Sequence, residues 1–382
     1  MKKVVLITFV FVLLLSQWGL TASKNDPYLI GAFLSISGPN APLGTPERDT
    51  LLMVQDKINK SGGINGRPIK VIIEDDATDP TNAVRAVKKL IDQDNVIALI
   101  GGTGTGSAAA AVNLISQAKR PFVTVCAGTA GVTEPVNPWV FRVPQTNRIM
   151  IKRIAEYLSS LKLTKVAMIY DSNAFGTDGR DKLRLQAPLS GLTIVDEESF
   201  NSKDTDFTVQ LTKAANSGAR AIICWGTNPA PAILAKNKKQ LGIHTSLIMC
   251  HGVANATFLE LAGTDAEGIT LPCGKIHVAK NLPASDPQRK VLLEYASEFK
   301  ARFNRTADPF GGHSWDALYI IAAAIKKAGT DPAKLRDAIE ATRGFVGIDG
   351  IISYSPTQHD GPTEDSVVMM KVVGGKWSLI WK

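Results

Sequence analysis

Cysteine is scarce in this sequence, with four residues among 382. Cys126, Cys224, Cys250 and Cys273 are widely spaced, and no CxxC pair occurs. This excludes a disulfide-stapled mini-domain. Cys250, His251 and Cys273 make only a weak metal-ligand pattern, so we predict no metal site. We expect buried structural thiols, and we leave a Cys224–Cys250 disulfide open because both residues end predicted strands.

Long apolar runs are also lacking. The longest candidate, Val4 to Leu15, has twelve residues, whereas a membrane span needs roughly 20. Met1-Lys2-Lys3 precedes it and Leu20-Thr-Ala22 follows, which is the pattern of a cleaved signal peptide over residues 1–22. The first cysteine is Cys126, so we expect no lipid anchor on cysteine. We therefore predict a mature protein that is free in the periplasm.

An excess of one charge is lacking as well. The chain has 43 basic and 35 acidic residues, and its formal charge is +6 once Lys2 and Lys3 leave with the leader. The basic runs at 236–239 and 326–327 fall at predicted helix ends, and no basic run alternates with aromatic residues as a nucleic-acid groove would. We expect no nucleic-acid partner.

Short apolar runs alternate with helical patterns along the whole chain. The first series has strands at 28–34, 69–74, 96–100 and 122–125, with helices at 45–60 and 79–92 between them. Thr45 with Pro46 and Asp79 with Pro80 are typical helix starts. A second series restarts at 166–170, with a helix at 205–217 that Asp204 would cap, and the tail 365–381 reads as a hairpin. The pattern predicts an α/β fold with two lobes.

The loop Gly101-Gly-Thr-Gly-Thr-Gly-Ser107 lies between a predicted strand and a helix from Ala108. Backbone N–H groups and hydroxyls at such a turn favour an anion. Gly104 to Ala109 also satisfies GxGxxA. A dinucleotide site, however, has this motif in its first β-α unit and an acidic residue at the end of the next strand, whereas here the motif lies in the third unit and that acidic residue is missing. No Walker lysine, HExxH or GxSxG motif occurs. We predict no enzyme, no catalytic residue and no cofactor.

Several motifs occur in one order and spacing along the mature chain. They are Ser37-Gly-Pro39, Gly44, Asn59 to Gly66, Glu74-Asp-Asp76, Asp79-Pro80, Gly101 to Ser107, Ala127-Gly-Thr129, Ala174-Phe-Gly176, His251 to Asn255, Gly268 and Trp315-Asp316. In these motifs the chain resembles the leucine/isoleucine/valine-type solute-binding proteins of ABC importers. The resemblance implies a type I periplasmic binding protein fold, with two Rossmann-like lobes joined by a three-segment hinge. Lobe 1 would comprise 24–145 and 277–345, and lobe 2 would comprise 146–276 and 346–382.

The same resemblance implies where a ligand binds. It places Thr105 and Gly106 at a carboxylate cradle, with the Ala127 carbonyl and the Thr129 amide and hydroxyl beside it. Where amino-acid-binding members have an acid for the ligand's ammonium group, this chain has His251. An imidazole is a poor ammonium partner, and a buried unpaired ammonium costs several kcal/mol. His251 would donate to a ligand oxygen, or it caps a strand end, or a nearby acid replaces the missing charge.

Apolar side chains occupy the other positions that the resemblance assigns to the ligand. They are Leu43, Phe175, Trp225 and Phe310, although each alone is also consistent with core packing. Together with the missing acid they favour a hydrophobic or aromatic monocarboxylate, with a branched-chain amino acid as the alternative. The expected partners are this small-molecule carboxylate and the membrane subunits of an ABC permease, and we expect a monomer. A soluble sensor for a membrane receptor is the other class that remains open.

Overall fold

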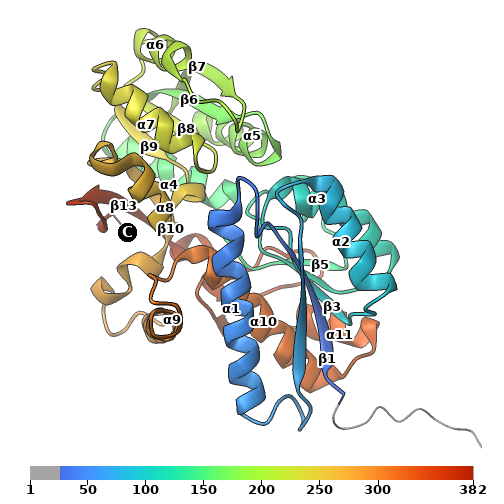
Figure 1. The fold of residues 1–382 in the computed structure, drawn as a ribbon. Coiled ribbons are helices and arrows are strands. Elements are labelled where there is room, and N and C mark those ends of the chain that lie inside the picture. The colour runs from blue at the N-terminus through green and yellow to red at the C-terminus, as the bar shows by residue number, and fades with distance from the viewer. Residues whose placement is uncertain (1–25, 382) are drawn as a thin grey trace, which may run out of the picture.

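The computed structural model describes residues 26–381, so the predicted signal peptide lies outside the described residues. Two sheets form two lobes, which lie one above the other in Figure 1. The first lobe alternates strands and helices, as the sequence predicts. Its first elements are β1 (Tyr28–Leu34), α1 (Ala41–Lys60), β2 (Ile69–Asp75), α2 (Pro80–Asp92), β3 (Ala98–Gly101), α3 (Thr105–Gln117), β4 (Phe122–Thr124) and β5 (Val140–Arg142).

The first sheet is entirely parallel, in the order β2-β1-β3-β4-β5. Phe33 and Leu99 belong to the buried cluster that includes α2 and α3 on one face. Ile30 and Ile100 belong to the cluster on the other face, where α1 packs against α10. A sheet covered on both faces accounts for the short, mostly apolar strands of the sequence. The later elements are α9 (Arg289–Phe303), α10 (Pro309–Ala328), α11 (Pro332–Glu340), β11 (Phe345–Val346) and β12 (Ile351–Ile352).

The second sheet repeats this arrangement and adds a hairpin. Its order is β14-β13-β10-β9-β8-β6-β7, and the five strands β6 to β10 are parallel to one another. The predicted tail hairpin is present as β13 and β14, and β13 pairs antiparallel with β10. The elements are α4 (Asn147–Ser160), β6 (Lys165–Asp171), α5 (Ala174–Leu189), β7 (Thr193–Phe200), α6 (Thr208–Asn216), β8 (Ala221–Trp225), α7 (Ala230–Gln240), β9 (Ser246–Met249), α8 (Ala256–Ala262), β10 (Thr270–Gly274), β13 (Val367–Val373) and β14 (Lys376–Trp381).

Two helix starts that were predicted from a capping residue are wrong. α1 begins at Ala41 and not after Thr45, because Pro42 already supplies a first-turn proline and Pro46 lies within the helix. α6 begins at Thr208, whose N–H donates to the side chain of Asp206 at 2.9 Å. Asp204, the predicted cap, instead accepts a hydrogen bond from the amide of residue 201. The start at Asp79 is confirmed, since its side chain accepts from the amides of residues 81 and 82.

The predicted third crossing near residue 346 also differs from the structure. The amide of Arg142 in β5 donates to the carbonyl of His359 at 2.9 Å, so this later segment still lies against the first sheet. Asp316 of α10 accepts hydrogen bonds from the amides of Ile348 and Asp349 at 2.8 Å each. These bonds hold the chain on the first lobe until it enters the second sheet at β13.

Candidate functional site

One cavity lies where the carboxyl ends of the two sheets face each other. Its volume is about 400 Å³, which is in the range of small-molecule sites. It is lined by Asn40, Leu43, Thr78, Pro80, Thr103, Gly104, Thr105, Gly106, Ser107, Val125, Ala127, Asn173, Ala174, Phe175, Ser202, Thr227, His251, Gly252, Phe310 and His313. None of these described lining residues is Asp, Glu, Lys or Arg. A charged ligand group must therefore be held by dipoles and neutral hydrogen-bonding groups.

The glycine-rich loop contributes the start of helix α3 to this cavity. The helix begins at Thr105, three residues earlier than predicted, so Thr105, Gly106 and Ser107 form its first turn. Gly104 precedes the helix and has no side chain to cap it. The first amides of a helix lack an intrahelical acceptor, and the helix dipole favours an anion there. The predicted cradle is therefore a helix N-terminus that opens on the cavity.

The glycines of this loop have two different roles. Gly101 and Gly102 have φ angles of +142° and +63°. A Cβ on Gly101 would lie 2.2 Å from the carbonyl oxygen of Phe33, and one on Gly102 would clash with α3. Gly106 has no such constraint, since a Cβ there would lie 3.5 Å from Pro80 Cγ. The turn explains Gly101 and Gly102, whereas Gly106 leaves open space at the cavity wall.

Two buried carboxyl groups lie behind the cradle. Thr103 Oγ1 accepts from the amide of Ser35 at 3.0 Å and donates to Glu47. Asp76 accepts from Ser35 Oγ at 2.6 Å and from the amide of Thr78 at 2.9 Å. Burial raises the pKa of Glu47 well above its usual value and also raises the pKa of Asp76. The raised pKa of Glu47 favours its neutral form, and a neutral carboxyl group does not repel an anion in the cradle.

The segment after β4 forms the wall beside α3. The amide of Gly128 donates to Thr105 Oγ1 at 3.3 Å. Arg142 is fully buried, donates to the carbonyl of Gly128 at 2.7 Å and pairs with Asp360 at 2.9 Å. These contacts hold the segment, including Ala127 at the cavity, against the first turn of α3.

His251 is the polar part of the second-lobe wall. The residue lies just after the end of β9 and is 8% exposed. Neither of its ring nitrogens has a hydrogen-bond partner among the described residues. Burial, with a smaller effect of His313, lowers its pKa to about 3. The ring lies edge-on to Phe175 at 5.5 Å and to Trp225 at 5.7 Å. His251 is therefore a neutral imidazole held between two aromatic rings.

The structure brings most of the predicted ligand residues to the cavity. Those that line it are Leu43, Thr105, Gly106, Ala127, Phe175, His251 and Phe310. Thr129 and Trp225 do not line it. Thr129 Oγ1 donates to Glu134 at 3.0 Å and lies 3.5 Å from Asp178 of α5, at a contact between the lobes. Trp225 is fully buried behind Phe175, with the ring centroids 5.9 Å apart.

Several lining residues were not predicted from the sequence. His313 lies three residues after Phe310 on α10, so the helical i, i+3 spacing is a signal that could have identified it. Thr227 Oγ1 donates to Asn40 Oδ1 at 3.0 Å and joins the two lobes at the cavity. No sequence motif marks Thr227 and Asn40, because their hydrogen bond forms only when the two lobes meet.

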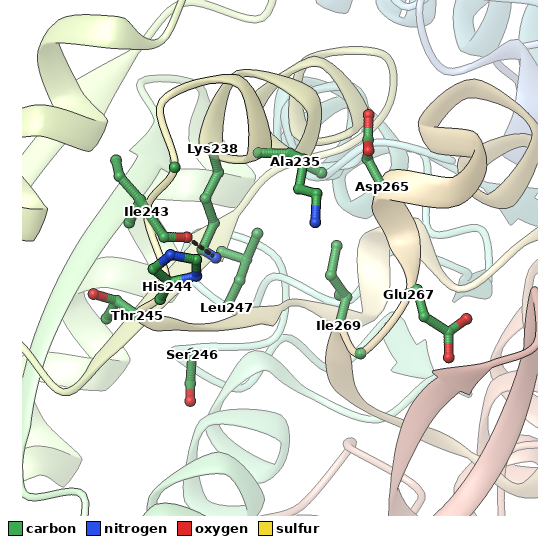
Figure 2. A pocket seen from close by; sticks show the side chains of 13 residues that line it. Ala235, Lys238, Ile243, His244, Thr245, Ser246, Leu247, Asp265, Glu267 and Ile269 are labelled. Atoms are coloured by element: carbon green, nitrogen blue, oxygen red, sulfur yellow. Dashed lines mark hydrogen bonds between the residues drawn. The ribbon is translucent and has the colours of Figure 1, made fainter.

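A second cavity, of about 420 Å³, lies at the opposite end of the second sheet (Figure 2). Its lining residues include Ser246 and Ile269, which lie at or before the amino ends of β9 and β10. Lys238 Nζ donates to the carbonyl of Ile243 at 2.7 Å, as the dashed line in Figure 2 shows. No predicted ligand residue lines this cavity. The geometry therefore favours the cavity between the lobes as the ligand site.

Residues 26–381 lack the features of a metal site and of a membrane span. No cluster of three or more His, Cys, Asp or Glu side chains in this range is arranged to hold a metal ion. All four cysteines are buried free thiols, Cys224 and Cys250 included. No helix in the described range has the length and apolar character of a membrane span.

Comparisons with known proteins agree with this architecture. Residues 27–376 match the profile of a family described as periplasmic binding protein. The chain is 26% identical to the leucine-, isoleucine-, valine-, threonine-, and alanine-binding protein of Pseudomonas aeruginosa. This match extends over 310 residues, which is 80% of each of the two chains. It is 27% identical to an extracellular ligand-binding receptor from Rhodopseudomonas palustris HaA2, with a TM-score of 0.87 over 93% of this chain and 100% of that chain. The isoleucine complex of LivJ, a branched-chain amino acid transporter substrate binding protein from Streptococcus pneumoniae, has a TM-score of 0.83 and 23% identity, over 94% of this chain and 100% of that chain. This last likeness shows a shared fold.

Proposed function

The chain belongs to the periplasmic binding protein family and has its type I fold, and we propose that it is the solute-binding component of an ABC importer. After removal of residues 1–22 it binds a small carboxylate between its two lobes. Closure of the lobes encloses the ligand, and a membrane permease takes it from the closed form. Binding without chemical conversion is the function that the site serves.

The favoured ligand is a hydrophobic or aromatic monocarboxylate. One observation carries this proposal: the cavity has a helix N-terminus for an anion, yet its described lining residues include no acid to pair with an ammonium group. Leu43, Phe175 and Phe310 supply apolar wall. Thr105 and Gly106 hold the carboxylate through backbone N–H groups and the threonine hydroxyl, so that no unpaired cation is buried in the empty site.

A branched-chain amino acid is the second candidate. The observation that favours it is the name of the Pseudomonas aeruginosa relative, which binds leucine, isoleucine, valine, threonine and alanine. On this alternative, the ammonium group would depend on carbonyl oxygens and hydroxyls alone.

Thermal unfolding of the mature chain distinguishes the two ligand classes. The protein is unfolded and refolded to remove carried ligand, then heated with leucine, isoleucine, valine, benzoate or phenylacetate. A ligand at a hundred times its dissociation constant adds about 2.7 kcal/mol of stability. We expect stabilisation by the aromatic acids and none by the amino acids. Stabilisation by leucine alone would refute the proposed ligand class and leave the transport role intact.

A further inference from the structure

The buried imidazole of His251 has two nitrogen atoms to which the described part of the chain offers no hydrogen-bond partner. A neutral imidazole has one N–H donor and one nitrogen acceptor. In His251 both nitrogens are buried and have no hydrogen-bond partner within residues 26–381, and the residue is 8% exposed. Buried polar groups almost always have a partner, and phenylalanine would fill this space between two aromatic rings without leaving any polar atom unpaired. The position therefore calls for a hydrogen-bonding group that enters from the cavity.

A second histidine reaches the same cavity from the other lobe. His313 is 6% exposed, and its Nδ1 lies 2.7 Å from Asp349 Oδ1. The backbone of Asp349 is held by Asp316, whose carboxylate accepts its amide at 2.8 Å. His313 lines the cavity, and among the described residues only its Nδ1 has a hydrogen-bond partner, so Nε2 is the ring nitrogen left for a ligand. Burial lowers the pKa of His313 to about 3, so this imidazole is also neutral.

Two neutral imidazoles select for a particular kind of ligand group. His251 and His313 line the same cavity from opposite lobes. A hydroxyl both donates and accepts, so it can take a hydrogen bond from one ring and give one to the other in either tautomer. An ammonium group only donates, and it would bring a charge that no described lining side chain neutralises.

We infer that the ligand is a hydroxycarboxylic acid whose hydroxyl group is held between His251 and His313 while its carboxylate lies at the first turn of α3. This inference rests on the proposed carboxylate-binding function and narrows it. The hydroxyl lies either on the carbon next to the carboxylate or on an aromatic ring, since both present the same hydrogen-bonding group.

Matched ligands test the inference in the refolded wild-type chain by titration calorimetry. The first set is 3-phenylpropionate, 3-phenyllactate and phenylalanine, which differ only in carrying hydrogen, hydroxyl or ammonium at one carbon. The second set is benzoate and 4-hydroxybenzoate. We expect the hydroxylated member of at least one set to bind roughly ten- to a hundred-fold more tightly than its unsubstituted analogue, as two hydrogen bonds would provide.

The variant His251→Phe identifies the groups responsible. Phenylalanine keeps the contacts with Phe175 and Trp225, so we expect an unchanged melting temperature and loss of most of the preference for the hydroxyl. Equal affinities of the hydroxylated acids and their unsubstituted analogues in the wild type, with weaker binding of phenylalanine, would overturn the inference and leave the monocarboxylate proposal standing. Tighter binding of phenylalanine, or no binding of any of these acids, would refute both. Because the wild-type comparison needs no variant, it is decisive even where His251→Phe does not fold.

Discussion

The buried carboxyl group of Asp308 is expected to make the stability of the fold depend on pH. It precedes α10, the helix that carries Phe310 and His313, and its side chain accepts from the amide of Gly311 at 3.0 Å. The residue is 9% exposed. Burial raises the pKa of Asp308 from 3.8 to about 7, against the smaller opposing effect of its hydrogen bond to Gly311. The perturbation we choose is Asp308→Asn, because asparagine keeps the capping oxygen and removes the charge.

The direction in which stability changes with pH follows from the proton that the Asp308 carboxyl group retains in the folded state. Below pH 4 the carboxyl is protonated in both the folded and the unfolded chain, so its ionisation does not affect stability. Between pH 4 and 7 the unfolded chain releases the proton more readily, so the wild type loses stability as pH rises. Above pH 7 the full cost of ionising this group in the folded state, roughly 4 kcal/mol, is present.

Calorimetric melting at pH 4.5 and pH 8 tests this reasoning. We expect Asp308→Asn to raise the melting temperature by roughly 5 °C at pH 8, from the size scaling of the unfolding entropy, and by much less at pH 4.5. Asp79→Asn is the matched control, since Asp79 also caps a helix but is exposed, and hydrogen bonds from the amides of Asn82 and Thr81 lower its pKa. The stability that Asp79 adds is present above its unfolded pKa and is lost as pH falls, so this control should not be stabilised at pH 8. Equal destabilisation by Asp308→Asn at both pH values would refute the argument.

Three further variants test the cavity and its support. His251→Glu places an acid in the cavity and should raise the affinity for leucine at least tenfold, measured by titration calorimetry; no gain would show that His251 does not face the ammonium position. Gly106→Ala should leave the melting temperature unchanged or higher, because its Cβ meets Pro80 only at 3.5 Å, yet it should weaken binding of the carboxylate; unchanged affinity would place the ligand away from this turn. Arg142→Gln leaves Asp360 buried without its partner and should cost about 3–5 kcal/mol of stability in urea unfolding, whereas a loss below 1 kcal/mol would contradict a structural role for the pair.

Local signals in the sequence were sufficient for most of the secondary structure. The apolar strands are buried on both faces, so their periodicity needed no knowledge of distant neighbours. Asp79 and Pro80 predicted the start of α2 because a cap acts within one turn. The same local reasoning failed at Thr45 and Asp204, where another proline or another aspartate a few residues away provides the actual start.

The candidate site was predicted only in part. Thr105 and His251 were found through the family resemblance, and their positions agree with the rule that ligands bind beyond the carboxyl ends of parallel strands. Packing between distant segments keeps Thr129 and Trp225 out of the cavity wall. Thr129 contacts the opposite lobe, and Trp225 lies behind Phe175.

The sequence by itself determined the alternation of strands and helices, the two lobes and the anion-favouring turn before α3, because apolar periodicity, caps and glycine conformations act over a few residues. The tertiary structure decided that the chain stays with the first lobe beyond residue 346, that His313 joins His251 at the cavity, and that no described lining residue is acidic. These features depend on contacts between distant segments, such as the bond between Arg142 and Asp360 across 218 positions. Composition and spacing do not encode such contacts, because burial and hydrogen bonding are settled only when distant segments pack together.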